Sequence, residues 1–152
     1  MSTRSTAIKR NIVLWFVTCG SIGYLPFMPG TFASLLACLL LFLFPGFFNH
    51  PLVVGLFIGA ALLSIHLIDS KDLHDPRWVV VDELAGMFLT MAGHGTGLSS
   101  LLKGFILFRL FDILKPYPIR RVENLPGTGG IVAADVAAGL FASVALTLLE
   151  RL

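Results

Sequence analysis

The stretch VVVDELAGMFL, residues 79–89, places two adjacent carboxylates in a run that is otherwise typical of a membrane helix. A charged side chain at the centre of a bilayer costs about 2.5–3.5 kcal/mol on insertion scales. Such residues are kept where they face the interior of a helical bundle or a water-filled cavity rather than lipid. Asp82 and Glu83 are therefore the first candidates for a functional site.

The composition favours a membrane protein. Of the 152 residues, 56% are hydrophobic and 13% are charged, whereas about a quarter of the residues of a soluble domain are charged. Residues 11–27 are apolar but contain glycines and a proline, and we expect an interfacial or re-entrant helix there. The predicted fold is an all-α integral membrane bundle, one domain over residues 1–152, with four to five spanning or partly spanning helices. The candidates, of which the last is short for a full span, are residues 32–48, 52–68, 98–114, 131–149 and 78–92.

Basic residues gather at one set of predicted helix ends. With a cytoplasmic N-terminus and five spans, most Lys and Arg residues fall on the cytoplasmic side, as the positive-inside rule requires. Four polar stretches then meet at that face, and they hold almost all of the acidic residues: GSIGYLPFMPGTFAS, IDSKDLHDPRWVVVDE, FRLFDILKPYPIRR and GTGGIVAADVAAG. We expect a site for a charged headgroup or a water-borne group there.

A glycine follows two of the acids at a spacing of four residues. Gly86 follows Asp82, and Gly139 follows Asp135, so each pair shares a helix face. Small residues allow membrane helices to approach closely. We therefore predict that two helices meet through these faces and bring the acids, including Glu83, together. The alternative is that the acids pair with nearby basic residues and anchor helix ends in water.

The stretch FRLFDILKP supplies positive charge. Arg109 and Asp112 share a helix face, and Lys115 follows three residues later. Arg and Lys are phosphate-binding donors, although an Arg109–Asp112 ion pair with a snorkelling Lys115 is the alternative. In PFMPGTFAS, Thr31 or Ser34 could cap a helix whose free N–H groups also suit a phosphate.

Clustered carboxylates without a His or Cys cluster favour a hard divalent cation such as Mg²⁺. Together with Arg and Lys at a membrane face, they indicate phosphoryl chemistry on a lipid headgroup. No Cys-x5-Arg motif follows Cys19 or Cys38, and no DxDx[TV] block is present. Attack by water activated by Mg²⁺ is favoured, and an aspartyl-phosphate intermediate stays open. His74 is a weaker acid–base candidate.

Four stretches resemble the signature blocks of the phosphatidylglycerophosphatase A family, in order between about Gly20 and Gly139: GYLPFMPGTFAS, HDPRWVVVDELAGMF, LFRLFDILKPYPI and GGIVAADVAAG. The resemblance implies a Mg²⁺-dependent enzyme of the bacterial cytoplasmic (inner) membrane. Such an enzyme converts phosphatidylglycerophosphate to phosphatidylglycerol and inorganic phosphate in phospholipid biosynthesis. One departure is that Ala134 stands where the family usually has the first of two adjacent acids.

The resulting hypothesis assigns a role to seven side chains. Asp82, Glu83, Asp112 and Asp135 would surround Mg²⁺, and one of the first three would act in acid–base catalysis. Thr31, Arg109 and Lys115 would hold the phosphate. The expected partner is the lipid substrate in a membrane; no nucleic acid is expected, and the oligomeric state is open. A small ion-coupled transporter and a non-catalytic lipid-headgroup-binding subunit are the alternatives.

Overall fold

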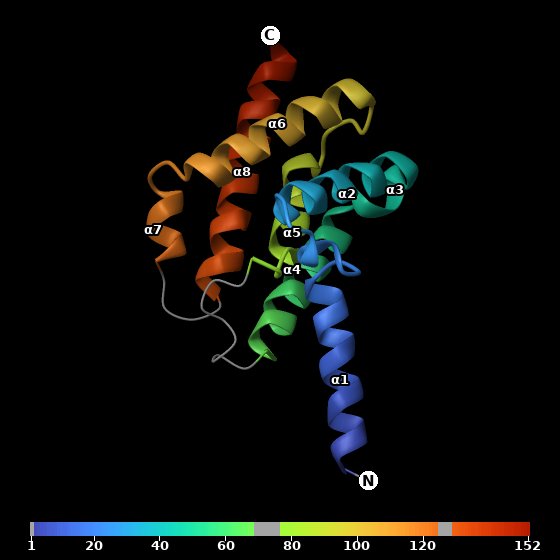
Figure 1. The fold of residues 1–152 in the computed structure, drawn as a ribbon. Helices are drawn as coiled ribbons and strands as arrows, with labels where there is room; N and C mark the ends of the chain where they lie inside the picture. The colour runs from blue at the N-terminus through green and yellow to red at the C-terminus, as the bar shows by residue number, and fades with distance from the viewer. Residues whose placement is uncertain (1, 69–76, 125–128) are drawn as a thin grey trace.

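The computed structural model describes residues 2–68, 77–124 and 129–152, and within these ranges every regular element is a helix (Figure 1). Lys71, His74 and Asp75, which belong to the polar stretch before Trp78, lie outside the described residues. The elements in chain order are α1 (Ser2–Val17), the 3-10 helix η1 (Ile22–Tyr24), α2 (Pro29–Leu43), α3 (Pro45–Phe48), α4 (Pro51–His66), α5 (Val81–Met91), α6 (Leu98–Leu114), α7 (Ile119–Glu123) and α8 (Gly129–Arg151).

Prolines set several helix starts. Pro29, Pro45 and Pro51 each lie in the first turn of their helix, where the missing N–H would have no partner inside the helix. α6 coincides with the predicted segment 98–114, and α4 and α8 fall on two more of the predicted segments. α2 ends at Leu43 rather than at residue 48, because the chain turns at Phe44 into the separate helix α3.

The N-terminal segment differs in extent from the prediction. α1 ends at Val17, and a turn and η1 follow, so residues 11–27 do not form one helix. Cys19, Gly20 and Ser21 all have positive φ, at 48°, 68° and 81°. Consecutive residues in the left-handed region cannot continue a right-handed helix, and this ends α1.

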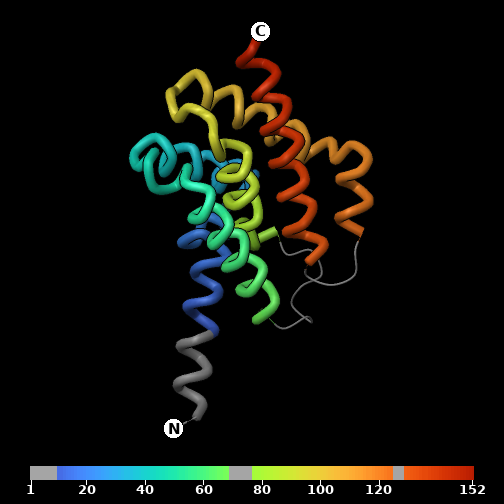
Figure 2. The backbone as a smooth tube through the Cα atoms, turned by 180° about the vertical axis from the view of Figure 1, so that it is seen from behind, coloured from blue at the N-terminus to red at the C-terminus, as the bar shows by residue number. Residues whose placement is uncertain are grey.

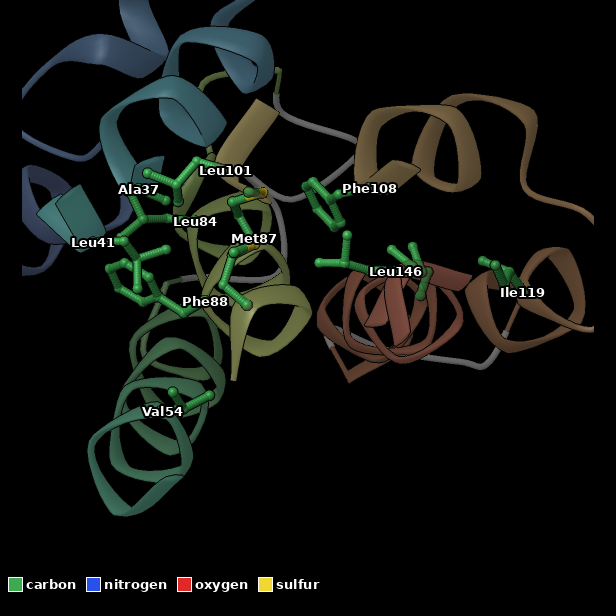
Figure 3. Packing of buried hydrophobic residues seen from close by; sticks show 14 residues of the cluster. Ala37, Leu41, Val54, Leu84, Met87, Phe88, Leu101, Phe108, Ile119 and Leu146 are labelled. Atoms are coloured by element: carbon green, nitrogen blue, oxygen red, sulfur yellow. The ribbon is translucent and has the colours of Figure 1, made fainter. Parts of the chain in front are cut away.

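The core is built around α5. Nine of its eleven residues are buried, and α2, α4, α6 and α8 all pack against it. Figure 3 shows Leu84 and Phe88 of α5 near Leu41 of α2, whereas Met87 lies toward Phe108 of α6. α5 is about 16 Å long at 1.5 Å per residue, about half of a 30 Å hydrocarbon layer. Its buried position places the first turn, with its two acids, inside the bundle.

α8 is the one helix of the described ranges that is long and apolar enough to cross a membrane, and α2 and α4 are shorter apolar helices. α5 and α8 run in the same direction, side by side in both views (Figures 1 and 2). Large apolar side chains also cover much of the outer surface; for example, Leu56 is 66% and Leu63 60% exposed on α4. An all-helical bundle with an apolar exterior is consistent with a helical membrane protein.

Candidate active site

α5 and α8 approach each other closely at the two predicted glycines. A methyl group at Gly139 would lie 2.5 Å from the Gly86 carbonyl oxygen, and one at Gly86 would lie 2.8 Å from the Asp135 carbonyl oxygen. The Thr90 hydroxyl, fully buried, donates to the Gly86 carbonyl at 2.9 Å and lies 3.4 Å from the Gly139 carbonyl. The predicted helix contact is confirmed, and only glycine permits it at these positions.

This contact brings three acids together. Asp82, Glu83 and Asp135 each offer a carboxylate oxygen within 4.8 Å of the others. Asp82 and Asp135 are only 4% and 5% exposed. The Asp82 Oδ1 and Glu83 Oε2 atoms are buried and accept no hydrogen bond from any described residue. Buried polar atoms are rarely left without partners, so the trio has unused capacity for a ligand.

The Glu83 carboxylate fits beside the first turn of α2 because Gly30 has no side chain there. A Cβ atom on Gly30 would overlap the Glu83 Oε1 atom, so the carboxylate lies directly against the first turn of α2. A negative charge near a helix N-terminus is favoured by the free N–H groups there. Neither Thr31 nor Ser34 caps α2, contrary to the sequence-based expectation. The N-cap residue is Met28, and the Ser34 hydroxyl donates instead to the Gly30 carbonyl.

The predicted basic residues lie beside the trio, and each pairs with an acid. Arg109 donates to Asp112 at 2.6 Å, as the ion-pair alternative anticipated, and its Nε atom is buried with no acceptor in the described ranges. Lys115 donates to Glu123 of α7. Burial by itself lowers the pKa of Lys115, but the Glu123 carboxylate outweighs burial and the pKa lies above its usual value. Lys115 is therefore a fixed positive charge.

One cavity of about 270 Å³ joins these groups. Its lining includes five carboxylates and three cationic side chains, so the net charge is −2 when all are ionised. The five acids are Asp82, Glu83, Asp112, Glu123 and Asp135, and the cations are Arg77, Arg109 and Lys115. Two acids already pair with Arg109 and Lys115, and the trio of Asp82, Glu83 and Asp135 remains. A divalent cation would balance that charge, and carboxylate oxygens are ligands that Mg²⁺ accepts.

The structure adds two residues that sequence reasoning did not place in the site. Arg77 counted only among the basic residues of the predicted cytoplasmic side, and Glu123 was assigned no role, yet both line the cavity. The available signal for Arg77 was its place in the polar stretch IDSKDLHDPRWVVVDE, five residues before Asp82. Among the described residues at the cavity wall, α2 contributes Pro29 and Gly30 rather than Thr31, whose hydroxyl is buried without a hydrogen bond.

Ala134 stands where the family usually has an acid, and the structure shows what surrounds it. Ala134 is 1% exposed and belongs to the apolar cluster that includes Phe108 and Ile119. Asp135, the next residue, lines the cavity. In this chain, position 134 therefore contributes to packing and supplies no carboxylate.

Comparison with known proteins agrees with the sequence blocks. Residues 15–150 match the family model of phosphatidylglycerophosphatase A. The chain is 34% identical over 132 residues to a putative phosphatidylinositol-3-phosphatase of Bacteroides thetaiotaomicron, covering 80% of this chain and 83% of that one. It is 33% identical over 127 residues to phosphatidylglycerophosphatase A of Escherichia coli, covering 80% and 73%.

A phosphatidylglycerophosphatase A of Haemophilus influenzae is 40% identical over 74 residues, which cover 47% of this chain and 45% of that one. No solved structure matches the chain significantly. The family match includes every acidic and basic residue that lines the cavity. The chain belongs to the phosphatidylglycerophosphatase A family.

Proposed function

We propose that the protein is a Mg²⁺-dependent lipid phosphatase that removes the terminal phosphate of phosphatidylglycerophosphate. The products would be phosphatidylglycerol and inorganic phosphate, released at the cytoplasmic face of the bacterial membrane in phospholipid biosynthesis. The observation that carries the proposal is the trio Asp82, Glu83 and Asp135, which lines one cavity together with cationic side chains. Two relatives bear the name of this activity, which supports the choice of substrate.

The cationic residues would bind the phosphate group. Arg109, Lys115 and Arg77 line the cavity, in which carboxylates outnumber cationic side chains. Arg can bind a phosphate through two parallel hydrogen bonds, and Lys contributes a compact charge. The unused Nε atom of Arg109 is one donor available to the substrate. Thr31, with a buried hydroxyl that has no partner in the described ranges, stays a candidate donor next to Gly30.

The carboxylates would hold the metal ion. Asp82, Glu83 and Asp135 are the proposed ligands, and Asp112 is a fourth that lines the same cavity. When bound, Mg²⁺ would offset negative charge on the phosphoryl oxygens and make water a better acid. The two buried carboxylate oxygens without hydrogen bonds support this assignment.

Hydrolysis then needs one proton acceptor from the protein. As the water oxygen attacks phosphorus, the bond from phosphorus to the glycerol oxygen breaks. A carboxylate of Asp82, Glu83 or Asp112 takes the water proton, and the departing alcohol oxygen receives a proton from that carboxylic acid or from solvent water. Asp112 is held in place by Arg109. In a two-step variant, an aspartate oxygen attacks first and water then cleaves the aspartyl phosphate.

A phosphoinositide monoester is a second candidate substrate. It is favoured by the relative from Bacteroides thetaiotaomicron, whose name specifies a phosphatidylinositol 3-phosphate. Both candidates present a phosphate monoester on a lipid headgroup, so the cavity chemistry is shared. They differ in whether the alcohol is a glycerol or an inositol ring.

The test is phosphate release by the purified full-length protein in detergent micelles. Phosphatidylglycerophosphate, phosphatidylinositol 3-phosphate and phosphatidic acid would be compared with added Mg²⁺ and with EDTA. We expect turnover of phosphatidylglycerophosphate with Mg²⁺, loss of turnover in EDTA and recovery when Mg²⁺ is restored. Full activity in chelator would contradict the metal assignment. Preference for the inositol lipid would select the second candidate, and no turnover of any lipid would favour the transporter or binding-subunit alternatives.

A further inference from the structure

A second cavity lies between α2 and α6, apart from the acidic one. We define it as the α2–α6 groove, a space of about 300 Å³. All of the described side chains in its wall are apolar, and they include Leu35, Cys38 and Leu39 of α2 and Leu98, Leu102 and Phe105 of α6. A wall of this kind offers no hydrogen bond to a polar ligand and selects for hydrocarbon.

The same two helices line the acidic cavity at their other ends. α2 begins there with Pro29 and Gly30, and α6 ends there with Arg109 and Asp112. The two helices lie side by side and run in opposite directions, as both views show (Figures 1 and 2). Leu35 is five residues after Gly30, a distance of about 7.5 Å along the helix. One molecule could therefore place a polar end in the acidic cavity and an apolar end in the groove.

The groove is open to the surroundings. Leu39 is 52% and Leu102 58% exposed on its two sides. A helix with its side chains is about 10 Å across, which is too wide to enter a space of this volume, so a protein helix is a poor occupant. A single hydrocarbon chain is narrow and flexible enough to enter and matches the apolar wall.

We propose that the α2–α6 groove binds one acyl chain of the lipid whose phosphate lies in the acidic cavity. This inference rests on the proposed function for its headgroup end and adds a determinant of chain length. The groove would hold a long-chain lipid phosphate in the orientation that presents its phosphate to the acids. A short-chain lipid with the same headgroup reaches the acids without filling the groove.

The first experiment fills the groove in the full-length protein. Leu102→Trp would be compared with Leu63→Trp, a change at a position of α4 that is 60% exposed and lies outside the groove. The substrates are dipalmitoyl and dihexanoyl phosphatidylglycerophosphate in the same detergent. We expect Leu102→Trp to lower the ratio of kcat/KM for the long over the short substrate about tenfold, the size of effect that a few lost methylene contacts produce. Leu63→Trp should keep the wild-type ratio. An unchanged ratio in Leu102→Trp, or equal losses on both substrates, overturns the proposal.

The second experiment does not depend on turnover. Cys38 lies in the groove, and Cys19, the other free cysteine, lies next to the Val80 carbonyl. In EDTA, dipalmitoyl phosphatidylglycerophosphate should slow alkylation of Cys38 relative to Cys19, and the dihexanoyl lipid should not, as followed by mass spectrometry. Equal rates with both lipids overturn the proposal. Protection that tracks protein concentration instead would identify a second copy and also overturn it. If no variant hydrolyses any lipid, the proposed function fails and the Cys38 result still decides the groove.

Discussion

Two polar clusters lie at opposite ends of the α5–α8 pair, and they differ in whether their polar atoms have hydrogen-bond partners. We call the trio Asp82, Glu83 and Asp135 the open cluster, and the group around His94 and Glu150 the closed cluster. At one end, Asp82 and Asp135 are buried beside the half-buried Glu83, and two carboxylate oxygens of the trio have no hydrogen-bond partner among the described residues. At the other end, some 22 Å along α8 at 1.5 Å per residue, Glu150 accepts a hydrogen bond from Ser100 at 2.7 Å and pairs with His94 at 2.9 Å.

In the closed cluster, the polar atoms form hydrogen bonds with one another and with nearby backbone groups. The other ring nitrogen of His94 lies 3.2 Å from the Ser143 hydroxyl. Asn49 donates to the His94 carbonyl at 2.7 Å and accepts from the Gly93 amide. These bonds tie the turns after α3 and α5 to the end of α8. A cluster whose polar atoms are hydrogen-bonded within the protein stabilises the fold. A cluster whose buried oxygens have no hydrogen-bond partner is suited to binding a ligand.

The largest expected effect is loss of phosphatase activity when a carboxylate of the open cluster is replaced by an amide. Glu83→Gln and Asp82→Asn remove a negative charge at nearly constant volume. We expect phosphate release from phosphatidylglycerophosphate to fall by at least about 100-fold, because a metal ligand or general base is lost. The change is measured as kcat on protein that inserts and purifies like the wild type. The matched control is Glu150→Gln, the same chemical change at the opposite end. Near-wild-type turnover of Glu83→Gln and Asp82→Asn would remove both residues from the site.

An intermediate effect is expected where the fold positions the open cluster. Gly30→Ala places a methyl group where the Glu83 Oε1 atom lies, so the carboxylate must move. A displacement on the order of 1 Å in a catalytic group can cost about 100-fold in rate, and we expect a loss between tenfold and this value. Gly59→Ala in α4 is the control, since nothing lies within 4 Å of a Cβ atom there. Equal activity of Gly30→Ala and Gly59→Ala would show that the contact between Glu83 and α2 has no role in positioning.

The smallest effect on activity is expected at the closed cluster. Glu150→Gln weakens the contacts to His94 and Ser100 and should lower the free energy of unfolding by about 1 kcal/mol, the usual net value of a hydrogen bond. Turnover should stay at the wild-type level. Thermal unfolding in detergent and phosphate release measure the two quantities on the same sample. A large loss of turnover with unchanged stability would show that the comparison between the clusters is wrong.

Much of the site could be predicted because its signals are local. A spacing of four residues puts Gly86 on the face of Asp82 and Gly139 on the face of Asp135 in any helix, and the structure confirms the contact that these pairs predict. Arg109 and Asp112 pair for the same reason, within one turn of α6. The bounds of α6 also followed from apolar length and the breakers around it.

Other features depend on which helices meet, and no local pattern contains that information. Glu83 lies against Gly30, 53 positions away in the chain, only because α2 packs on α5. Lys115 pairs with Glu123 because α7 turns back after Pro116 and Pro118. Arg77 enters the cavity, and the α2–α6 groove forms, through the same long-range packing.

The sequence by itself determined that this chain is an all-helical, apolar bundle with acids on two glycine-bearing helix faces, because helix periodicity and breakers act within a few residues. Only the tertiary structure decided which basic residues face the acids, which turn of α2 lies against Glu83 and where a second cavity lies. Those choices are made by close packing between helices distant in sequence, where a single added methyl group at Gly30, Gly86 or Gly139 would change the contact.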